Sequence, residues 1–464
     1  MGPIESIFTA VHRIPRLHFA PSSAVLSVKS SSSSHQLGQE SLQTFVETRC
    51  PSLNEEFLPP WWLFKRVLGH LQTAYAVVGD FSKVDKVEYD RTLLRTLDGG
   101  TIGLDTTPPA DERTLQDDTP IVVVLHGLTG GSHESYVRAI LAPACTPVEE
   151  GGLGYRGIVV NFRGCAGVPI TSPQLYSAGH TDDIRVAVLH IANRYPRAPL
   201  LGIGFSLGAN VLTRYLAEEG ERSRLLAGCA VACPWDLVKN ARCHIATQMC
   251  SASLEDRWFY RNIYSKAMAR NLQTLVTRHA DQIAKFGHAP LADAVTEVLQ
   301  TKYMLLSEFD SKVTCVAGGS SPPFPFPSAW EYYAWASSHR MLPHVRVPFL
   351  AINSEDDPIV RVLPVEAGGN PCVAFAVTQE GGHLGWFEKA SDTGEIRRWV
   401  RKPVLEWLRA VGEDLVADNR QVKPSHVVDG FLKEIGRDDI GCKVVEGGGH
   451  IIGVEGEEGL LAGL

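Results

Sequence analysis

Four short apolar segments between residues 121 and 233 alternate with segments of helical periodicity. The apolar segments lie at 121–125, 157–162, 200–204 and 226–233, and residues 182–195 and 210–219 space their apolar side chains at helical intervals. Continuous apolar runs of this length are typical of strands that are buried on both faces, as in parallel sheets. The sequence therefore predicts the α/β fold class, with a mostly parallel central sheet and helices on both faces.

Segments on either side of this alternation extend the predicted architecture. Residues 87–94 and 101–104 flank the turn Asp98-Gly99-Gly100 and predict a β-hairpin, and 347–353 and 373–377 predict two later strands. Between 237 and 345 the pattern is helical, which indicates an insertion. We divide the chain into a flexible leader (1–50), an α/β core with its N-terminal segment (51–236 and 346–411), a helical lid or cap insertion (237–345) and a Gly-rich acidic C-terminal tail (412–464).

Composition and charge exclude several classes of protein. With 44% hydrophobic and 21% charged residues, the chain is neither wholly disordered nor a coiled coil. Its net charge is −8 and no Lys/Arg block stands out, so we expect no nucleic-acid partner and favour a neutral or apolar small molecule. Composition says nothing about the oligomeric state.

The ten cysteines are dispersed and form no Cys-x-x-Cys pair, which predicts reduced thiols in a cytoplasmic compartment. The nearest approach to a metal cluster is Cys229, Cys233, Cys243 and His244. Their spacing misses the usual zinc patterns, so we predict neither a metal nor a cofactor.

No apolar run reaches the roughly 18–20 residues of a transmembrane helix, so we expect a soluble or peripheral protein. The Ser-rich leader overlaps in composition with organellar transit peptides, and organellar targeting stays an alternative to a plain disordered leader. The cluster Trp61-Trp62-Leu63-Phe64 suits packing on the core, with docking on lipid droplets or membranes as the alternative.

The pentapeptide Gly204-Phe205-Ser206-Leu207-Gly208 directly follows one predicted strand and precedes a predicted helix. A Gly-x-Ser-x-Gly at such a turn needs its glycines because the neighbouring backbone crowds the nucleophile. The serine hydroxyl is then exposed at the carboxyl edge of the sheet. Ser206 is therefore the predicted nucleophile.

A serine nucleophile needs a base, and the base needs an orienting carboxylate. His383 lies in a glycine-flanked loop after strand 373–377, and Asp357 follows strand 347–353. The carboxyl ends of consecutive parallel strands share one sheet edge, which makes His383 the predicted base and Asp357 the predicted acid. The neighbouring Asp356 stays an alternative for the acid.

Acyl transfer also needs two N–H groups directed at the developing oxyanion. The residue after the nucleophile, Leu207, supplies one predicted donor, and Leu128 in the loop 126–132 supplies the other. We expect His126 to shape this turn and Arg163 to anchor the neighbouring loops. The pattern from His288 to Asp293 resembles an acyltransferase His-x4-Asp motif, but chance explains that spacing better.

Five segments together resemble the AB hydrolase superfamily, AB hydrolase 4 family. They are His126-Gly-Leu-Thr-Gly-Gly-Ser132, Asn161-Phe-Arg-Gly-Cys165, Gly204-Phe-Ser-Leu-Gly-Ala-Asn210, Glu355-Asp-Asp-Pro-Ile359 and Gly381-Gly-His-Leu-Gly385. Upstream, Gly69-His-Leu-Gln-Thr73 is similar to the family's N-terminal segment. That family contains fungal medium-chain fatty acid ethyl ester synthase/esterases, monoacylglycerol lipases and phospholipase-type members. The resemblance implies an α/β-hydrolase fold and a charge relay of Ser206, Asp357 and His383.

The resemblance also implies short- to medium-chain acyl esters or acylglycerols as substrates. We predict a carboxylic ester hydrolase that works through an acyl-enzyme. An alternative is an acyltransferase that passes an acyl group from acyl-CoA or a polyketide thioester to an alcohol with the same three residues. A third hypothesis is a catalytically inactive binding module on the same scaffold, which an intact set of catalytic residues disfavours.

Overall fold

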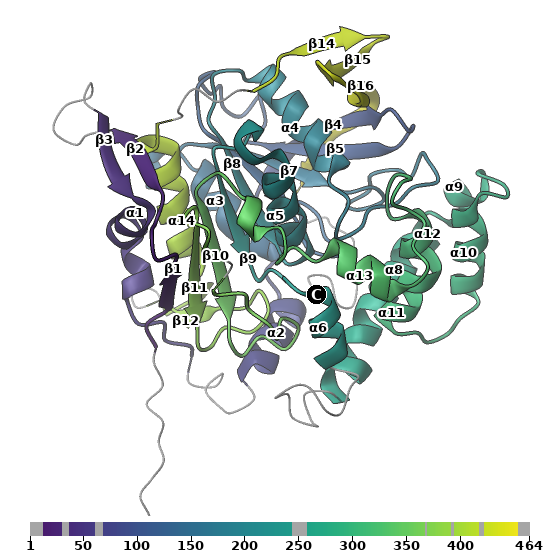
Figure 1. Ribbon diagram of the computed structural model, residues 1–464, viewed down its shortest axis with the longest axis horizontal. Helices are drawn as coiled ribbons and strands as arrows, with labels where there is room; N and C mark the ends of the chain where they lie inside the picture. Colours follow the sequence, from purple (N-terminus) through teal and green to yellow (C-terminus); the bar gives the residue numbers. More distant parts are fainter. Residues whose placement is uncertain are drawn as a thin grey trace, which may run out of the picture.

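The computed structural model describes residues 13–29, 37–60, 68–243, 258–366, 369–390, 394–416 and 422–452. Within these residues a twelve-stranded sheet has the order β1-β11-β10-β9-β8-β6-β7-β5-β4-β16-β15-β14 (Figure 1). Its central strands are β6 (Ile121–Leu125), β7 (Arg156–Asn161), β8 (Leu200–Phe205), β9 (Ala227–Val231), β10 (Phe349–Ser354) and β11 (Val373–Thr378). These six strands run parallel, which confirms the predicted mostly parallel sheet.

Antiparallel strands extend this parallel centre at both ends. Beyond β7 lie β5 (Thr101–Thr107) and β4 (Glu88–Thr96), which form the predicted hairpin. Two further two-stranded sheets join β2 (Val25–Lys29) to β3 (Leu37–Ser41) and β12 (Phe387–Lys389) to β13 (Ile396–Arg398).

Helices cover both faces of the sheet, as predicted (Figure 1). Alternate side chains of β6 enter two separate cores, with Val123 in one and Val124 in the other. The first core contains residues of α4 (Asp182–Arg194) and α5 (Leu207–Glu219). The second contains residues of α1 (Leu42–Arg49), α3 (Ser135–Cys145) and α14 (Arg401–Arg409). Burial on both sides explains why β6 is continuously apolar in sequence.

Residues 237–345 contain helices but no strand among the described residues. Their α-helices are α6 (Leu237–Cys243), α8 (Ser265–Arg278), α9 (Ala280–Ala284), α10 (Pro290–Leu299), α11 (Leu306–Phe309), α12 (Cys315–Ala317) and α13 (Ala329–Ala336). Two π-helical turns, Tyr260–Tyr264 and Asp310–Thr314, precede α8 and α12. The insertion lies beside the carboxyl ends of the parallel strands, and its role as a lid remains our proposal.

The structure differs from the expected leader and tail, because parts of both join the main sheet. β1 (Arg16–Phe19) pairs with β11 at one end. At the other end β16 (Arg437–Ile452) pairs with β4 and is followed outward by β15 (Phe431–Glu434) and β14 (Ser425–Val428). The glycines near 447–449 lie at a register shift in the β16–β4 pair, where Gly449 has φ 153°. A β-bulge of this kind hides the strand's period from sequence analysis.

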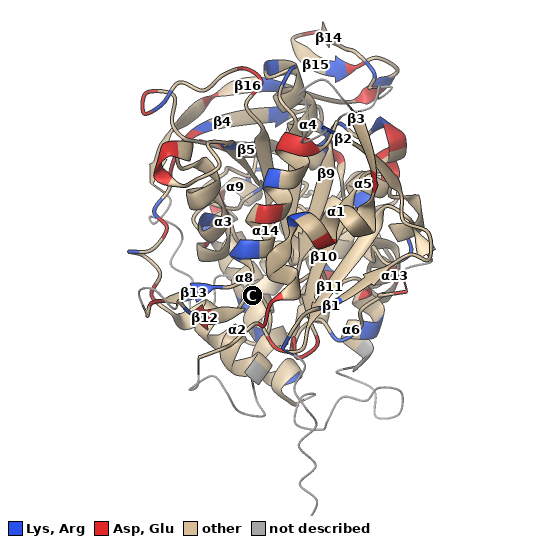
Figure 2. Ribbon diagram, turned by 90° about the vertical axis from the view of Figure 1, so that its left-hand side faces the viewer, with Lys and Arg blue, Asp and Glu red and all other residues tan. Residues whose placement is uncertain are grey.

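Charged side chains and cysteines are spread over many elements of the described structure. Lys and Arg are interspersed with Asp and Glu on the face shown in Figure 2. The described cysteines that form no disulfide include Cys50, Cys145, Cys165, Cys229, Cys233, Cys315, Cys372 and Cys442. No group of metal-ligating side chains is found among the described residues. His244 and the cluster Trp61 to Phe64 lie outside the described residues. No helix in the described ranges is both long and apolar enough to cross a membrane.

Candidate active site

Ser206 occupies a strained turn between β8 and α5. Its backbone has φ 49° and ψ −118°, a conformation that non-glycine residues adopt only when their surroundings impose it. A side chain on Gly204 would lie 2.6 Å from the backbone of α5, and one on Gly208 would lie 2.3 Å from the carbonyl oxygen of Leu125. The two glycines therefore let the turn approach both neighbouring segments, as the motif predicted.

The structure brings Ser206, His383 and Asp357 into one hydrogen-bonded chain. His383 Nε2 lies 2.8 Å from Ser206 Oγ, and His383 Nδ1 lies 2.8 Å from Asp357 Oδ2. Asp357 Oδ1 accepts backbone N–H bonds from Ile359 at 2.7 Å and Val360 at 2.9 Å. The imidazole and the carboxylate are both fully buried. This arrangement can deprotonate a serine hydroxyl and stabilise the imidazolium that results.

Asp356, the alternative acid, points away from the imidazole. Its Oδ1 accepts the backbone N–H of Gly382 at 2.8 Å and the hydroxyl of Ser354. Its Oδ2 is buried without a hydrogen-bond partner among the described residues. Burial is the largest cause that raises the pKa of Asp356 to about 6. Asp356 therefore holds the loop that carries His383, and only Asp357 contacts the imidazole.

The segment Gly69-His70-Leu71-Gln72-Thr73 supports the same loop from α2 (Leu68–Val78). Thr73 Oγ1 accepts the backbone N–H of His383 at 2.9 Å and donates to the carbonyl of Gly69 at 2.6 Å. Gln72 Oε1 accepts the backbone N–H of Phe387 at 2.8 Å. The segment is recognisable in the sequence but its role is not, because the contacts join residues about three hundred positions apart.

The two predicted oxyanion donors lie beside Ser206 and line the same cavity. The neighbouring amides have partners, since Gly127 N–H donates to the Tyr136 hydroxyl and Thr129 N–H to the Tyr176 hydroxyl, both at 2.9 Å. Leu128 and Leu207 donate no backbone hydrogen bond to any described residue. Both amides are therefore available to an oxyanion.

His126 and Arg163 lie in structural networks rather than in the cavity. His126 Nε2 accepts the backbone N–H of Phe162 at 3.2 Å, and His126 Nδ1 donates to the carbonyl of Gly127 at 2.7 Å. Burial lowers the pKa of His126 to about 3. Arg163 is buried and binds Asp183 at 2.7 Å as well as Asp98. Burial opposes its charge, but these carboxylates outweigh burial and raise the pKa of Arg163. Both residues therefore hold loops, as the sequence suggested.

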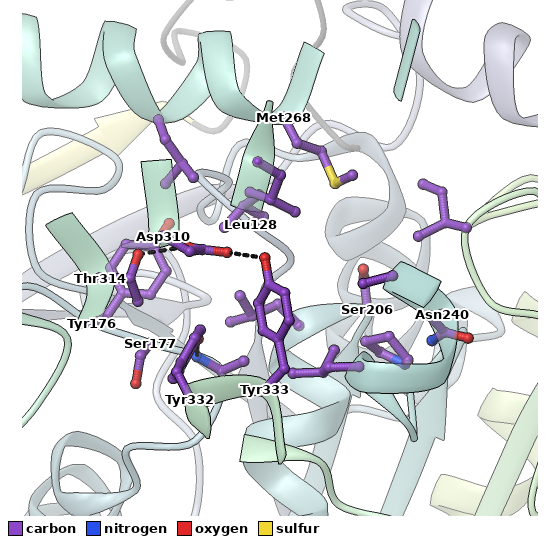
Figure 3. Close-up of a pocket in the computed structure, with 18 of the residues that line it drawn as sticks. Leu128, Tyr176, Ser177, Ser206, Asn240, Met268, Asp310, Thr314, Tyr332 and Tyr333 are labelled. Atoms are coloured by element: carbon purple, nitrogen blue, oxygen red, sulfur yellow. Dashed lines mark hydrogen bonds between the residues drawn. The ribbon is translucent and has the colours of Figure 1, made fainter. Parts of the chain in front are cut away.

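The cavity above Ser206 has a largely apolar wall. Core loops contribute Leu128, Tyr176 and Ile359. The insertion contributes most of the other lining residues, including Tyr260, Met268, Leu272, Leu306, Tyr332 and Tyr333 (Figure 3). His288 and Asp293 are exposed and do not line it. The cavity suits an apolar ligand whose reactive group lies at Ser206.

Comparison with known proteins places this arrangement in a family. Residues 122–396 match the sequence profile of the alpha/beta hydrolase family. The chain belongs to this family. The matched region contains Ser206, Asp357 and His383 and most of the residues that line the cavity.

Several curated relatives of this alpha/beta hydrolase are at least 31% identical to it. A monoacylglycerol lipase of Saccharomyces cerevisiae is 32% identical over 386 residues, which cover 75% of this chain and 80% of the relative. Phospholipase ABHD3 of Bos taurus is 32% identical over 358 residues, covering 76% and 78%. Medium-chain fatty acid ethyl ester synthase/esterase 2 of Saccharomyces cerevisiae is 31% identical over 410 residues, covering 75% and 85%. These relatives confirm the family resemblance and the predicted class of carboxylic ester hydrolase.

The alpha/beta hydrolase also carries polar cavity residues that the sequence analysis missed. Asp310 accepts hydrogen bonds from the hydroxyls of Tyr333 and Thr314, both at 2.6 Å, inside the otherwise apolar wall (Figure 3). Burial raises the pKa of Asp310 to about 6. Asn240 of α6 is the second such residue. No local motif identifies either one, because the described residues of the insertion include no strand-to-helix turn to mark its polar positions.

Proposed function

We propose that this alpha/beta hydrolase cleaves esters of short- to medium-chain fatty acids, including acylglycerols, through an acyl-enzyme on Ser206. The observation that carries the proposal is the hydrogen-bonded chain from Ser206 through His383 to Asp357 at the floor of an apolar cavity. A nucleophile, an oriented base and a site for an apolar acyl group occur together there.

The proposed reaction has two half-reactions. Ser206 Oγ attacks the ester carbonyl while His383 Nε2 takes its proton, and the Leu128 and Leu207 amides stabilise the oxyanion. His383 then donates the proton to the leaving alcohol. In the second half-reaction water attacks the acyl-enzyme, and His383 again takes and returns a proton. Asp357 holds the imidazolium throughout.

The substrate class rests on the cavity and on the relatives. Binding sites for small molecules are concave and mostly apolar, with a few polar groups that fix the orientation of the ligand, and the lining of this cavity has that character. Its aliphatic and aromatic wall favours an acyl chain over a charged substrate. The relatives named as a monoacylglycerol lipase and a phospholipase support a lipid ester.

A panel of p-nitrophenyl esters of graded chain length tests the hydrolase proposal. Wild type should hydrolyse short- and medium-chain esters and react with a fluorophosphonate probe. Ser206→Ala should lose both activities, with a fall in kcat of roughly 10⁴-fold or more. Ser311→Ala, at an exposed position of the insertion, is the matched control and should keep them. Turnover that survives in Ser206→Ala contradicts the proposal.

Acyl transfer to an alcohol is the second candidate, since one relative is named an ethyl ester synthase/esterase. The same acyl-enzyme would be attacked by an alcohol instead of water, which would make a new ester. Adding ethanol to the assay and measuring free acid against ethyl ester separates the two. A serine-dependent ethyl ester as the main product would favour transfer.

A further inference from the structure

Asn240 places an amide in the wall of the cavity that contains Ser206. It lies on α6 and is 4% exposed. Its Oδ1 accepts the backbone N–H of Arg361 at 3.1 Å. Because the side-chain oxygen is held by this N–H, the amide cannot turn over without losing that bond, and the NH₂ group is fixed in direction.

The Nδ2 atom of Asn240 is buried and has no hydrogen-bond partner among the described residues. In Figure 3 the amide nitrogen lies on the side of Ser206 and the amide oxygen on the far side. Most buried donors in folded proteins have a partner, so an unmatched one in a cavity wall indicates a ligand acceptor. The acceptor that this donor fits is an oxygen of a molecule bound next to Ser206.

The position of Asn240 separates it from the apolar part of the cavity. Figure 3 places Asn240 on one side of Ser206 and both Met268 and Asp310 on the other. An acyl chain carries no acceptor beyond its carbonyl, and the proposed oxyanion donors take that oxygen. The ester oxygen of the leaving alcohol receives its proton from His383. In a monoacylglycerol the remaining acceptors are the two free hydroxyls of the glycerol.

We propose that Asn240 Nδ2 donates a hydrogen bond to a free hydroxyl of the substrate's alcohol, and so selects acylglycerols over esters of simple alcohols. The acyl chain then lies on the Met268 side of Ser206 and the glycerol on the Asn240 side. This inference rests on the proposed ester hydrolase function and adds a residue that determines specificity for its leaving group.

Two esters with the same acyl chain test the inference. The kcat/KM values for 1-decanoylglycerol and ethyl decanoate are measured for wild type, Asn240→Leu and Asn240→Asp. The leucine variant keeps the side-chain size and removes both polar atoms. The aspartate variant keeps an oxygen for Arg361 N–H, and its other oxygen can still accept a hydrogen bond from a substrate hydroxyl, so it reports on local folding rather than on loss of that bond. Thermal unfolding of each variant checks the fold.

We expect Asn240→Leu to lose about tenfold in kcat/KM for 1-decanoylglycerol, the worth of one neutral hydrogen bond, and both variants to lose less than twofold for ethyl decanoate. Equal losses of Asn240→Leu on both esters, or no loss on either, would overturn the inference while leaving the hydrolase proposal intact. If wild type hydrolyses neither ester, the proposed function fails and the inference fails with it. Binding of the non-hydrolysable 1-O-decylglycerol gives a second readout. The affinity of Ser206→Ala for this ether should fall about tenfold when Asn240→Leu is added.

Discussion

Thr73 Oγ1 accepts the backbone N–H of His383 at 2.9 Å, which ties helix α2 to the loop that carries the proposed catalytic base. The hydroxyl also donates to Gly69, so it is held in place from its own helix. His383 therefore has its imidazole positioned by Asp357 and its backbone positioned by Thr73.

Replacing Thr73 by Val should lower kcat roughly 10- to 100-fold with little change in KM, because the His383 N–H loses its acceptor and the imidazole shifts. Thr73→Ser, which keeps the hydroxyl, should restore most of the activity. Thr48→Val is the matched control, since Thr48 is exposed on α1 and bonds only to Glu40 and to residues of its own helix. Steady-state kinetics with p-nitrophenyl esters measures all three variants, and a Thr73→Ser variant as slow as Thr73→Val would contradict this role.

Asp357→Asn should reduce kcat by about 10⁴-fold, because the amide no longer holds the imidazole in its productive tautomer or stabilises its charge. Asp356→Asn should reduce kcat by less than about tenfold, since the amide oxygen can still accept Gly382 N–H. The two neighbouring variants control for each other. Comparable losses would mean that the contact between Asp357 and His383 does not decide the proton transfer.

Arg163→Met should destabilise the protein by about 3–5 kcal/mol, because Asp183 is left as a buried carboxylate without its partner. Arg197→Met removes a pair with Asp117 in which both side chains are mostly exposed, and should cost about 0.5 kcal/mol or less. Urea unfolding of the two variants and wild type gives both values. A small effect at Arg163 would show that Asp183 is satisfied by other groups.

Asp310 gives stability a specific pH dependence. Burial raises its pKa from an ordinary value of 3.8 to about 6, so between these pH values the folded state holds a proton that the unfolded state has released. The contribution of Asp310 to the free energy of unfolding is therefore fully present below pH 3.8 and is lost as pH rises through about 6. The loss amounts to about 1–3 kcal/mol.

Asp310→Asn should remove this contribution, so the urea midpoint should fall less between pH 4.5 and pH 7 than it does in wild type. Asp356, whose pKa is also raised to about 6, accounts for a remaining part of the slope. Asp293→Asn, on the exposed surface of α10, should leave the wild-type slope unchanged. An unaltered slope in Asp310→Asn would remove Asp310 as its source.

The central sheet could be predicted because each of its strands is marked by a few adjacent residues in the sequence. Each parallel strand is buried on both faces, so it appears in the sequence as a short apolar run that is followed by a helical pattern. The strands β1, β14 and β16, which extend the sheet beyond its predicted strands, could not be predicted in this way. They are half-exposed, short or interrupted by a bulge, and they form only because the edges of the sheet offer unpaired backbone groups.

The residues of the candidate site fall into the same two groups: those that local sequence indicates and those that only the fold brings together. The sequence alone singled out Ser206, His383 and the two backbone amides as candidates, because each lies at a strand end whose turn is recognisable from a few adjacent residues. Only the tertiary structure decided between Asp356 and Asp357, since consecutive side chains point in different directions and one of them meets the imidazole. It alone also brought Thr73, Asp310 and Asn240 to the site, because a hydrogen bond or a cavity wall depends on distance in space and leaves no mark in the order of the residues.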